Sequence, residues 1–188
     1  DEAIEMVPSL RHVIVLRNSR SAFNLQPGRD LAFDELIMDQ PKQAKTAILE
    51  AEAILMILYT SGTTGRPKGA VHTHCGFPVK AAQDMAFGTD VHTDDVIYWM
   101  TDMGWMMGPW LVYGALILGA TALLFDGAPD FPDHQRIWSL CERHGVTVLG
   151  VSPTLIRALM PLGADFTKEF DLSRIRCFGS TGEPWNPA

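Results

Sequence analysis

Short β-type apolar runs alternate with helix-type segments between residues 96 and 178, and this alternation constrains the fold more than any other feature of the chain. Predicted strands cover residues 96–99, 121–125, 146–151 and 175–178, and predicted helices cover residues 109–118, 133–144 and 153–162. Gly119 and Gly145 stand where glycine commonly ends a helix, and Ser152 stands where serine commonly caps one. Strands that alternate with helices form βαβ units. The sequence therefore predicts an α/β fold, with a mostly parallel sheet that carries helices on both faces.

The first third of the chain carries weaker signals. A β-rich run at residues 12–16 predicts a strand, and the apolar spacing over residues 31–38 predicts a short helix. Residues 41–53 are polar and alanine-rich, which fits either a helix or a surface connection. This part is therefore expected to be a leading segment, residues 1–53, ahead of the main core.

A hairpin is predicted where the core begins. The apolar run at residues 54–58 reads as one strand, and residues 70–72 read as a second strand that returns beside it. A helix is expected to follow, with Thr73 or His74 as its cap, and to end near Phe87. The loop of this hairpin is the most unusual stretch of the sequence.

That loop, residues 59–69, reads Y-T-S-G-T-T-G-R-P-K-G. Its glycines let a ligand approach the backbone, successive N–H groups in such a turn can bind an anion, and Lys68 adds a compact positive charge. The combination suits a polyphosphate. It is not a Walker A loop, because Pro67 stands where that motif needs its second glycine after Gly62. The alternative is an ordinary polar connection, although such loops seldom place a lysine after this string.

Three glycine- or hydroxyl-rich segments follow predicted strands and are expected at the carboxyl ends of a parallel sheet, where such sheets bind ligands. They are the phosphate loop, residues 60–69, and residues 101–108 and 179–184. Residues 101–108 read T-D-M-G-W-M-M-G, in which two glycines bracket apolar side chains that would wall a small pocket or join the core. Residues 179–187 read G-S-T-G-E-P-W-N-P, which fits either a nucleotide-binding turn or a plain entry into a helix.

Composition excludes several classes of protein. The chain has a net charge of −7 and no long basic run, so nucleic acid is disfavoured as a partner. Its three cysteines are far apart and odd in number, which argues against a disulfide framework or a zinc ribbon and favours a reducing cytoplasm. His72-x-His74-Cys75 offers too few ligands for a closed metal site, so no metal is expected there. Glycines interrupt the longest apolar stretch, and neither a membrane span nor a signal peptide is predicted.

The three segments together resemble the adenylate-forming superfamily. Residues 59–69 are similar to its phosphate-binding motif, while T-D-M-G-W and G-S-T-G-E-P are similar to segments of the acetyl-CoA synthetase group. Further similarity runs along most of the chain, including R-H-V-I-V-L from residue 11 and P-T-L-I-R-A-L from residue 153. The order and spacing of the three segments also agree with that group.

The resemblance implies a role for each matching residue. The phosphates of ATP would be held by Thr60, Ser61, Gly62, Thr63, Thr64, Gly65 and Lys68, with Lys68 as the catalytic residue. Gly182, Glu183 and Pro184 would flank the nucleotide, and Trp105, Met106, Met107 and Thr181 would line the acyl pocket. The two methionines are larger than the residues that acetate-selective members carry, so the acyl preference stays open.

The activity implied is that of an AMP-forming acyl-CoA synthetase, an acid–thiol ligase. A short carboxylate such as acetate would react with ATP to give acyl-AMP and pyrophosphate, and coenzyme A (CoA) would then take the acyl group. Mg²⁺ would assist, with its main ligand outside residues 1–188. Two alternatives remain: a noncatalytic nucleotide-binding module, or an adenylation domain acting on another carboxylate.

Family members carry segments that residues 1–188 do not match, including a C-terminal domain with an adenylation lysine. The resemblance therefore implies that the chain is part of the N-terminal ATP- and acyl-binding domain, with the phosphate loop and αβ core in residues 54–188. The isolated chain is expected to be inactive. Its expected partners are small molecules, not nucleic acid or a membrane.

Overall fold

The computed structural model of the chain describes residues 2–18, 24–60, 65–163 and 165–186. The chain divides into two compact units, Asp1–Ile48 and Leu49–Ala188, each of which is described by itself. Within the described residues, no helix is both long enough and apolar enough to cross a membrane.

The first unit contains a small parallel pair of strands. Its elements are α1 (Glu2–Glu5), β1 (Val13–Val15), β2 (Asp30–Ala32) and α2 (Phe33–Ile37). Strand β1 pairs with β2, which places Val13 beside Asp30 and Val15 beside Ala32. The strand predicted at residues 12–16 is present. The helix predicted from residue 31 begins two residues late, because the first residues of that segment are taken up by β2.

The second unit begins with the predicted hairpin. Strands β3 (Ile54–Thr60) and β4 (Lys68–Thr73) pair antiparallel and are followed by helix α3 (Gly76–Gly88). The N-cap of α3 is Cys75, not Thr73 or His74, and its side chain makes no capping hydrogen bond. The Thr73 hydroxyl serves the same purpose from one turn away, since it accepts a hydrogen bond from the Gly76 N–H at 3.1 Å.

A four-stranded parallel sheet forms the centre of the second unit. Its strands run in the order β6 (Thr121–Leu123), β5 (Val96–Trp99), β7 (Val148–Val151) and β8 (Cys177–Ser180). The predicted strands are all present, but β7 starts two residues late and β8 is shifted two residues toward the C-terminus. These bounds follow from pairing across the sheet, where Val148 lies beside Cys177 and Val151 beside Ser180.

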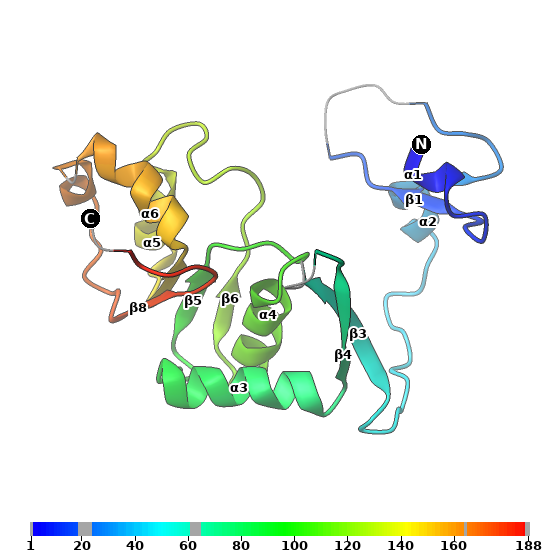
Figure 1. Ribbon diagram of the computed structural model, residues 1–188, viewed down its shortest axis with the longest axis horizontal. Coiled ribbons are helices and arrows are strands. Elements are labelled where there is room, and N and C mark those ends of the chain that lie inside the picture. Colours follow the sequence, from blue (N-terminus) through cyan, green and yellow to red (C-terminus); the bar gives the residue numbers. More distant parts are fainter. Residues whose placement is uncertain (1, 19–23, 61–64, 164, 187–188) are drawn as a thin grey trace. The chain divides into compact units, whose positions relative to one another are not determined.

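Helices cover both faces of this sheet, as predicted (Figure 1). On one face, Ile97, Trp99 and Val148 pack with α3 and with α4 (Met107–Ile117). On the other face, Tyr98, Leu149 and Val151 pack with α5 (Arg136–His144) and α6 (Pro153–Leu159). The alternation of these side chains is the two-residue period of a strand buried on both faces. Short 3₁₀ helices, Met160–Leu162 and Asp165–Glu169, follow α6.

One expectation about the strand ends is wrong. Residues 101–108 do follow β5, and residues 179–184 comprise the last two residues of β8 and the turn after it, at the carboxyl edge of the parallel sheet. The phosphate loop, in contrast, connects the two strands of a separate antiparallel pair, β3 and β4. The apolar run before the loop predicted the hairpin but could not show that the hairpin forms a sheet of its own, because a strand can have the same apolar pattern in either sheet. Side chains Leu55, Met56 and Leu58 of β3 still pack against the core beneath α3 and α4.

Trp99 lies across the sheet over two glycines. Its neighbour on β7 is Gly150, whose own neighbour on β8 is Gly179. A Cβ atom added at Gly150 would overlap the indole ring, and one added at Gly179 would come within 2.5 Å of it. The ring also meets Trp110 of α4 edge to face, with 4.9 Å between centroids. Both glycines are therefore required by close packing against Trp99.

A buried carboxylate ties the amino ends of three strands together. Asp95, which is 4% exposed and precedes β5, accepts hydrogen bonds from Thr147 Oγ1 at 2.6 Å and from the His92 N–H at 2.8 Å. Arg176, which precedes β8, donates to the same carboxylate from Nε at 3.1 Å and also from Nη2. Burial alone would raise the pKa of Asp95, but the hydrogen bonds from Arg176, Thr147 and His92 outweigh it and lower the pKa to about 2.

Asp95→Asn is expected to lower the free energy of unfolding by about 2 kcal/mol near pH 7. The pKa of this carboxyl is lower in the folded chain than in the unfolded chain, so its contribution is complete above about pH 4 and is lost as the pH falls toward about 2. Urea denaturation at several pH values measures the effect. The difference between wild type and variant should shrink over that range, whereas Asp94→Asn, at an exposed neighbour, should change little.

Candidate active site

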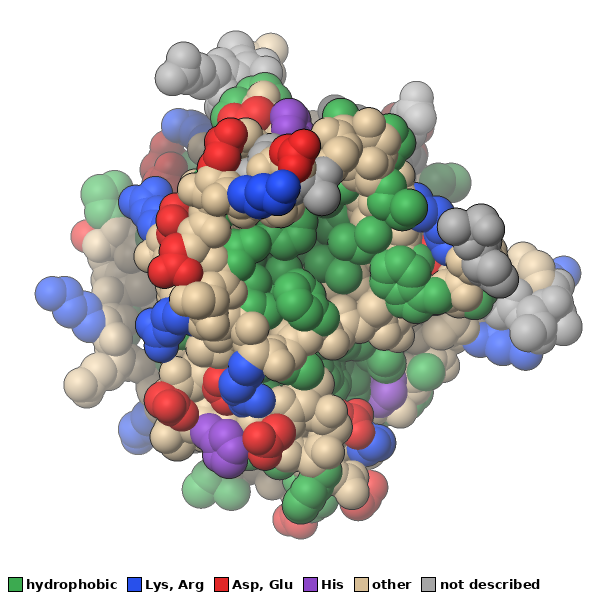
Figure 2. Space-filling view, turned by 90° about the vertical axis from the view of Figure 1, so that its left-hand side faces the viewer, with side chains coloured by type: hydrophobic (Ala, Val, Ile, Leu, Met, Phe, Trp, Pro, Cys, Tyr) green, Lys and Arg blue, Asp and Glu red, His purple; other side chains and the backbone are tan. Residues whose placement is uncertain are grey.

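A cavity of about 930 Å³ opens at the carboxyl ends of all four parallel strands. Its lining comes from the last residues of β5, β6 and β7, from the residues that follow them, from the start of α4 and from the turn after β8. This is the position at which open parallel sheets bind ligands. On the face shown in Figure 2, acidic and basic side chains are interspersed around a hydrophobic hollow. This face therefore carries no large basic patch.

Most of the residues proposed for the acyl group and the nucleotide lie around this one cavity. They are Trp105, Met106, Met107, Thr181, Gly182 and Glu183. Although the acyl and nucleotide segments are more than seventy residues apart in sequence, the strand order places them at one edge. Pro184 follows the cavity-lining turn and does not line the cavity itself.

Other lining residues were not singled out in the sequence. They are chiefly strand-end residues, including Tyr98, Trp99, Met100, Phe125, Asp126 and Ser152. Each follows or ends a predicted strand, so the strand-end rule applied to all four strands would have found them. Sequence motifs drew attention only to the ends of β5 and β8.

The turn after β5 fixes the direction of the apolar side chains. Asp102 Oδ1 accepts a hydrogen bond from the Gly104 N–H at 2.6 Å, and the Asp102 carbonyl accepts one from the Trp105 N–H at 3.1 Å. Gly108 then packs directly on the Asp102 carbonyl, where any added Cβ atom would clash. This tight path starts α4 at Met107 and leaves the Trp105 side chain 71% exposed beside the cavity. A ligand can therefore cover Trp105 without displacing core residues.

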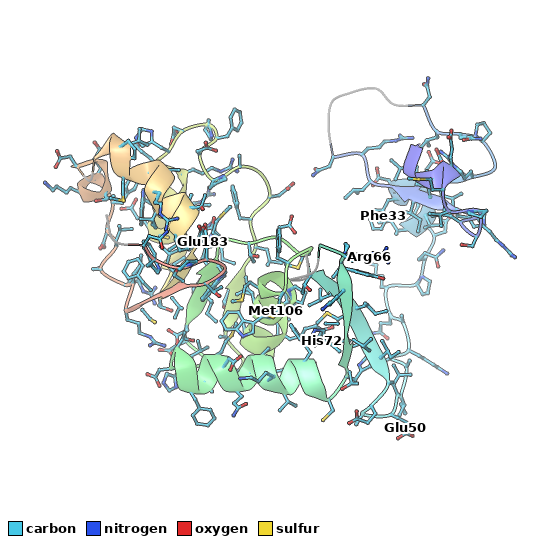
Figure 3. All side chains as sticks on the ribbon, viewed as in Figure 1. Phe33, Glu50, Arg66, His72, Met106 and Glu183 are labelled. Carbon is cyan, nitrogen blue, oxygen red and sulfur yellow. The ribbon has the colours of Figure 1, made fainter. Side chains whose placement is uncertain are left out.

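The carboxylate of Glu183, which is labelled in Figure 3, is already engaged by the protein. Oε1 accepts from the Thr154 N–H at 2.8 Å, at the start of α6, and Oε2 accepts from Arg157 Nη1 at 3.0 Å. Arg157 Nη2 also donates to the Pro184 carbonyl at 3.0 Å. Hydrogen bonding to Thr154, with Arg157 beside it, holds the pKa of Glu183 below its usual value. The G-E-P turn is thus fastened to the P-T-L-I-R segment, which the sequence did not connect with it.

The described ends of the phosphate loop are Thr60 and Gly65 to Lys68. Thr60 and Lys68 face each other as the last pair of the β3–β4 hairpin, and the Lys68 side chain is exposed. Gly65 has a φ of +79°, in the left-handed region that favours glycine. Four residues predicted to bind phosphate, Ser61, Gly62, Thr63 and Thr64, lie outside the described residues.

Among the described residues, no three His, Cys, Asp or Glu side chains come together as a metal site. Mg²⁺ is commonly held by one or two carboxylates together with substrate phosphates and water, so a Mg²⁺ site does not require such a cluster.

Residues 3–188 match the family model described as AMP-binding enzyme, and the chain belongs to this family of adenylate-forming enzymes. The resemblance inferred from the three segments is thereby confirmed. Among curated relatives, the acetyl-coenzyme A synthetase of Methanothrix thermoacetophila is 46% identical over 189 residues, covering 100% of this chain and 28% of the relative. The acetyl-coenzyme A synthetase of Gemmatimonas aurantiaca is 44% identical over 195 residues, covering 100% of this chain and 30% of the relative.

A solved structure supports the same family. The acetoacetyl-CoA synthetase from Streptomyces lividans superposes with a TM-score of 0.80 and 32% sequence identity, covering 97% of this chain and 28% of that chain. The chain thus spans less than a third of the length of the relatives that it matches.

Proposed function

We propose that the protein containing this chain is an AMP-forming acyl-CoA synthetase that activates a short carboxylate. The observation that carries the proposal is the single cavity where Trp105, Met107 and Thr181 lie with the Gly182-Glu183 turn. An apolar pocket beside a glycine-rich turn suits a small acyl group next to a nucleotide. The names of the relatives agree with this reaction class.

In the first half-reaction, a carboxylate oxygen attacks the α-phosphorus of ATP and the bond to pyrophosphate breaks. In the second, the sulfur of CoA attacks the acyl carbon, AMP leaves, and the thiol loses its proton. The apolar residues of the cavity would hold the acyl group in line for both attacks. Thr60, Lys68 and the rest of the phosphate loop would hold the β- and γ-phosphates, and Lys68 would stabilise the charge that grows on pyrophosphate. Bound Mg²⁺ would supply further positive charge to the phosphates.

The turn containing Gly182, Glu183 and Pro184 would border the nucleotide through its backbone. In this proposal the Glu183 side chain acts indirectly, because its carboxylate is occupied by Thr154 and Arg157. Residues 54–188 would form the phosphate loop and αβ core of an N-terminal domain, and the remaining catalytic parts would lie elsewhere in the full-length protein. Residues 1–188 alone should accordingly be inactive.

The full-length protein tests this proposal. With ATP, Mg²⁺ and labelled pyrophosphate, label should enter ATP only when a carboxylate such as acetate is added, and AMP should accumulate when CoA is added. Exchange without AMP formation on CoA addition would indicate an adenylation domain with another acceptor. Nucleotide binding with neither activity would indicate a noncatalytic module.

Arg157→Met should raise the KM for ATP about fivefold to tenfold, with a smaller change in kcat. The variant removes two hydrogen bonds that fasten the Glu183-Pro184 turn, each worth about 1 kcal/mol. Arg157→Lys should recover only part of the loss, since a lysine cannot hold two acceptors in the geometry of a guanidinium. Steady-state kinetics on the full-length protein measures both constants. An equal fall in kcat for the two variants, with KM unchanged, would contradict this positioning role.

A further inference from the structure

A second cavity, of about 610 Å³, lies between β4, α3 and α4. It is distinct from the cavity at the strand ends but has part of its wall in common with it. The side chains that border both cavities are Trp99, Met106, Met107 and Thr181. Three of these four belong to the residues proposed to hold the acyl group, so the second cavity continues from the acyl end of the site and not from its nucleotide end.

The inner wall of the second cavity is largely aromatic and apolar. Phe77 and Ala81 of α3 line it together with Trp110 of α4. On the side of β4, the His72 ring meets Phe77 edge to face, with 5.0 Å between centroids. In Figure 3, Met106 and His72 mark the two sides, one at the start of α4 and the other on β4. Such walls bind hydrocarbon well and give it little specific hydrogen bonding.

The charged side chains of the lining compensate each other. Lys80 and Asp84 are one turn apart on α3 and form an ion pair through Nζ and Oδ1. Apart from His72, the remaining lining residues have uncharged side chains. A charged group that entered this cavity would lose its hydration, and it would find no unpaired opposite charge to offset that loss.

We propose that the second cavity receives the carbon chain of an unbranched, uncharged monocarboxylic acid longer than acetate. This inference rests on the proposed function. A volume of about 610 Å³ lies in the range of ligand pockets and exceeds what a two-carbon acyl group needs. With the carboxyl group beside the nucleotide turn, carbons beyond the first would pass the flexible side chains of Met106 and Met107 and enter the cavity.

The substrate series should show this directly in the full-length protein. Each methylene buried in an apolar cavity favours the transition state about fourfold. The value of kcat/KM for carboxylate-dependent pyrophosphate exchange should therefore rise from acetate to butyrate by about tenfold or more. Succinate, which has the carbon count of butyrate but a second charge, should be a poor substrate.

Two variants test the assignment of the cavity. Val71→Phe narrows it from the surface of β4, where Val71 is 55% exposed and so tolerates a larger side chain. The ratio of kcat/KM for butyrate to that for acetate should fall by about tenfold, close to the expected gain for the chain. Val79→Phe is the matched control, because Val79 is 61% exposed on α3 and does not line the cavity. It should leave the ratio unchanged.

Asp84→Asn tests the assignment of the cavity through charge and not through the size of the cavity. It leaves the charge of Lys80 uncompensated, so kcat/KM for succinate should rise relative to butyrate by about threefold or more. Acetate as the best substrate, with a butyrate-to-acetate ratio that Val71→Phe leaves unchanged, would overturn the assignment while leaving the proposed function intact. Failure of every acid to support exchange would instead overturn the proposed function.

Discussion

Lys68→Ala should reduce carboxylate-dependent ATP–pyrophosphate exchange in the full-length protein by about 100-fold or more. Lys68 begins β4 opposite Thr60, with its side chain exposed at the described edge of the phosphate loop. Negative charge on pyrophosphate grows as its bond to the α-phosphorus breaks, so a lysine that holds it acts mainly in the transition state. Loss of one such donor commonly costs on the order of 3–4 kcal/mol. The fall should therefore appear in kcat more than in KM.

The second half-reaction supplies the control for this variant. Thioester formation from added acyl-AMP and CoA should be far less affected, because pyrophosphate has left by that stage. Lys45→Ala, at an exposed cation in the first unit, should leave both half-reactions unchanged. If Lys68→Ala lowers the two half-reactions equally, the effect comes from damage to the fold, and Lys68 does not act on the phosphates.

Gly150→Ala should lower the free energy of unfolding by about 3 kcal/mol, at the upper end of the usual cost of overpacking a core. The new methyl group would overlap the indole ring of Trp99, which is 7% exposed and already meets Trp110 on α4. Gly179 packs against the outer edge of the same ring and Trp110 meets it edge to face, so a shift of the ring would disturb both contacts. Urea denaturation followed by circular dichroism measures the change.

Gly88→Ala is the control for this prediction, and Trp99→Leu tests whether the overlap with the indole is the cause. At Gly88 an added Cβ atom meets nothing within 4 Å, and the residue ends α3 with an ordinary φ, so Gly88→Ala should be neutral or slightly stabilising. Trp99→Leu should cost less in the Gly150→Ala background than in the wild type, since it removes the overlap. Strict additivity of the two substitutions would show that Gly150 is not required by the indole.

The sequence predicted features that depend on neighbours along the chain. Ser152 caps α6 by accepting from the Leu155 N–H at 3.1 Å, and Gly145 ends α5 in the left-handed conformation. Both follow from local backbone chemistry that one residue type satisfies best. The alternation of strands and helices that gave the fold class is local in the same sense.

Features that depend on distant pairing were missed. Strand β2 consists of three residues that pair with β1 across a connection, which no local pattern reveals. The phosphate loop was wrongly placed at the edge of the parallel sheet, because the apolar run of β3 does not show whether the β3–β4 hairpin joins that sheet or forms a sheet of its own. In the site, the motifs identified Glu183, but its partner Arg157 is 26 residues away and was noticed only as part of a similar string.

The position of Trp99 gives this protein a built-in optical reporter. Its indole borders both cavities while remaining shielded from bulk water. A molecule that enters either cavity replaces water at the edge of this ring and changes the polarity around it. Occupancy can therefore be followed by intrinsic emission without a label, and a Trp99→Phe protein identifies which part of the signal belongs to this residue.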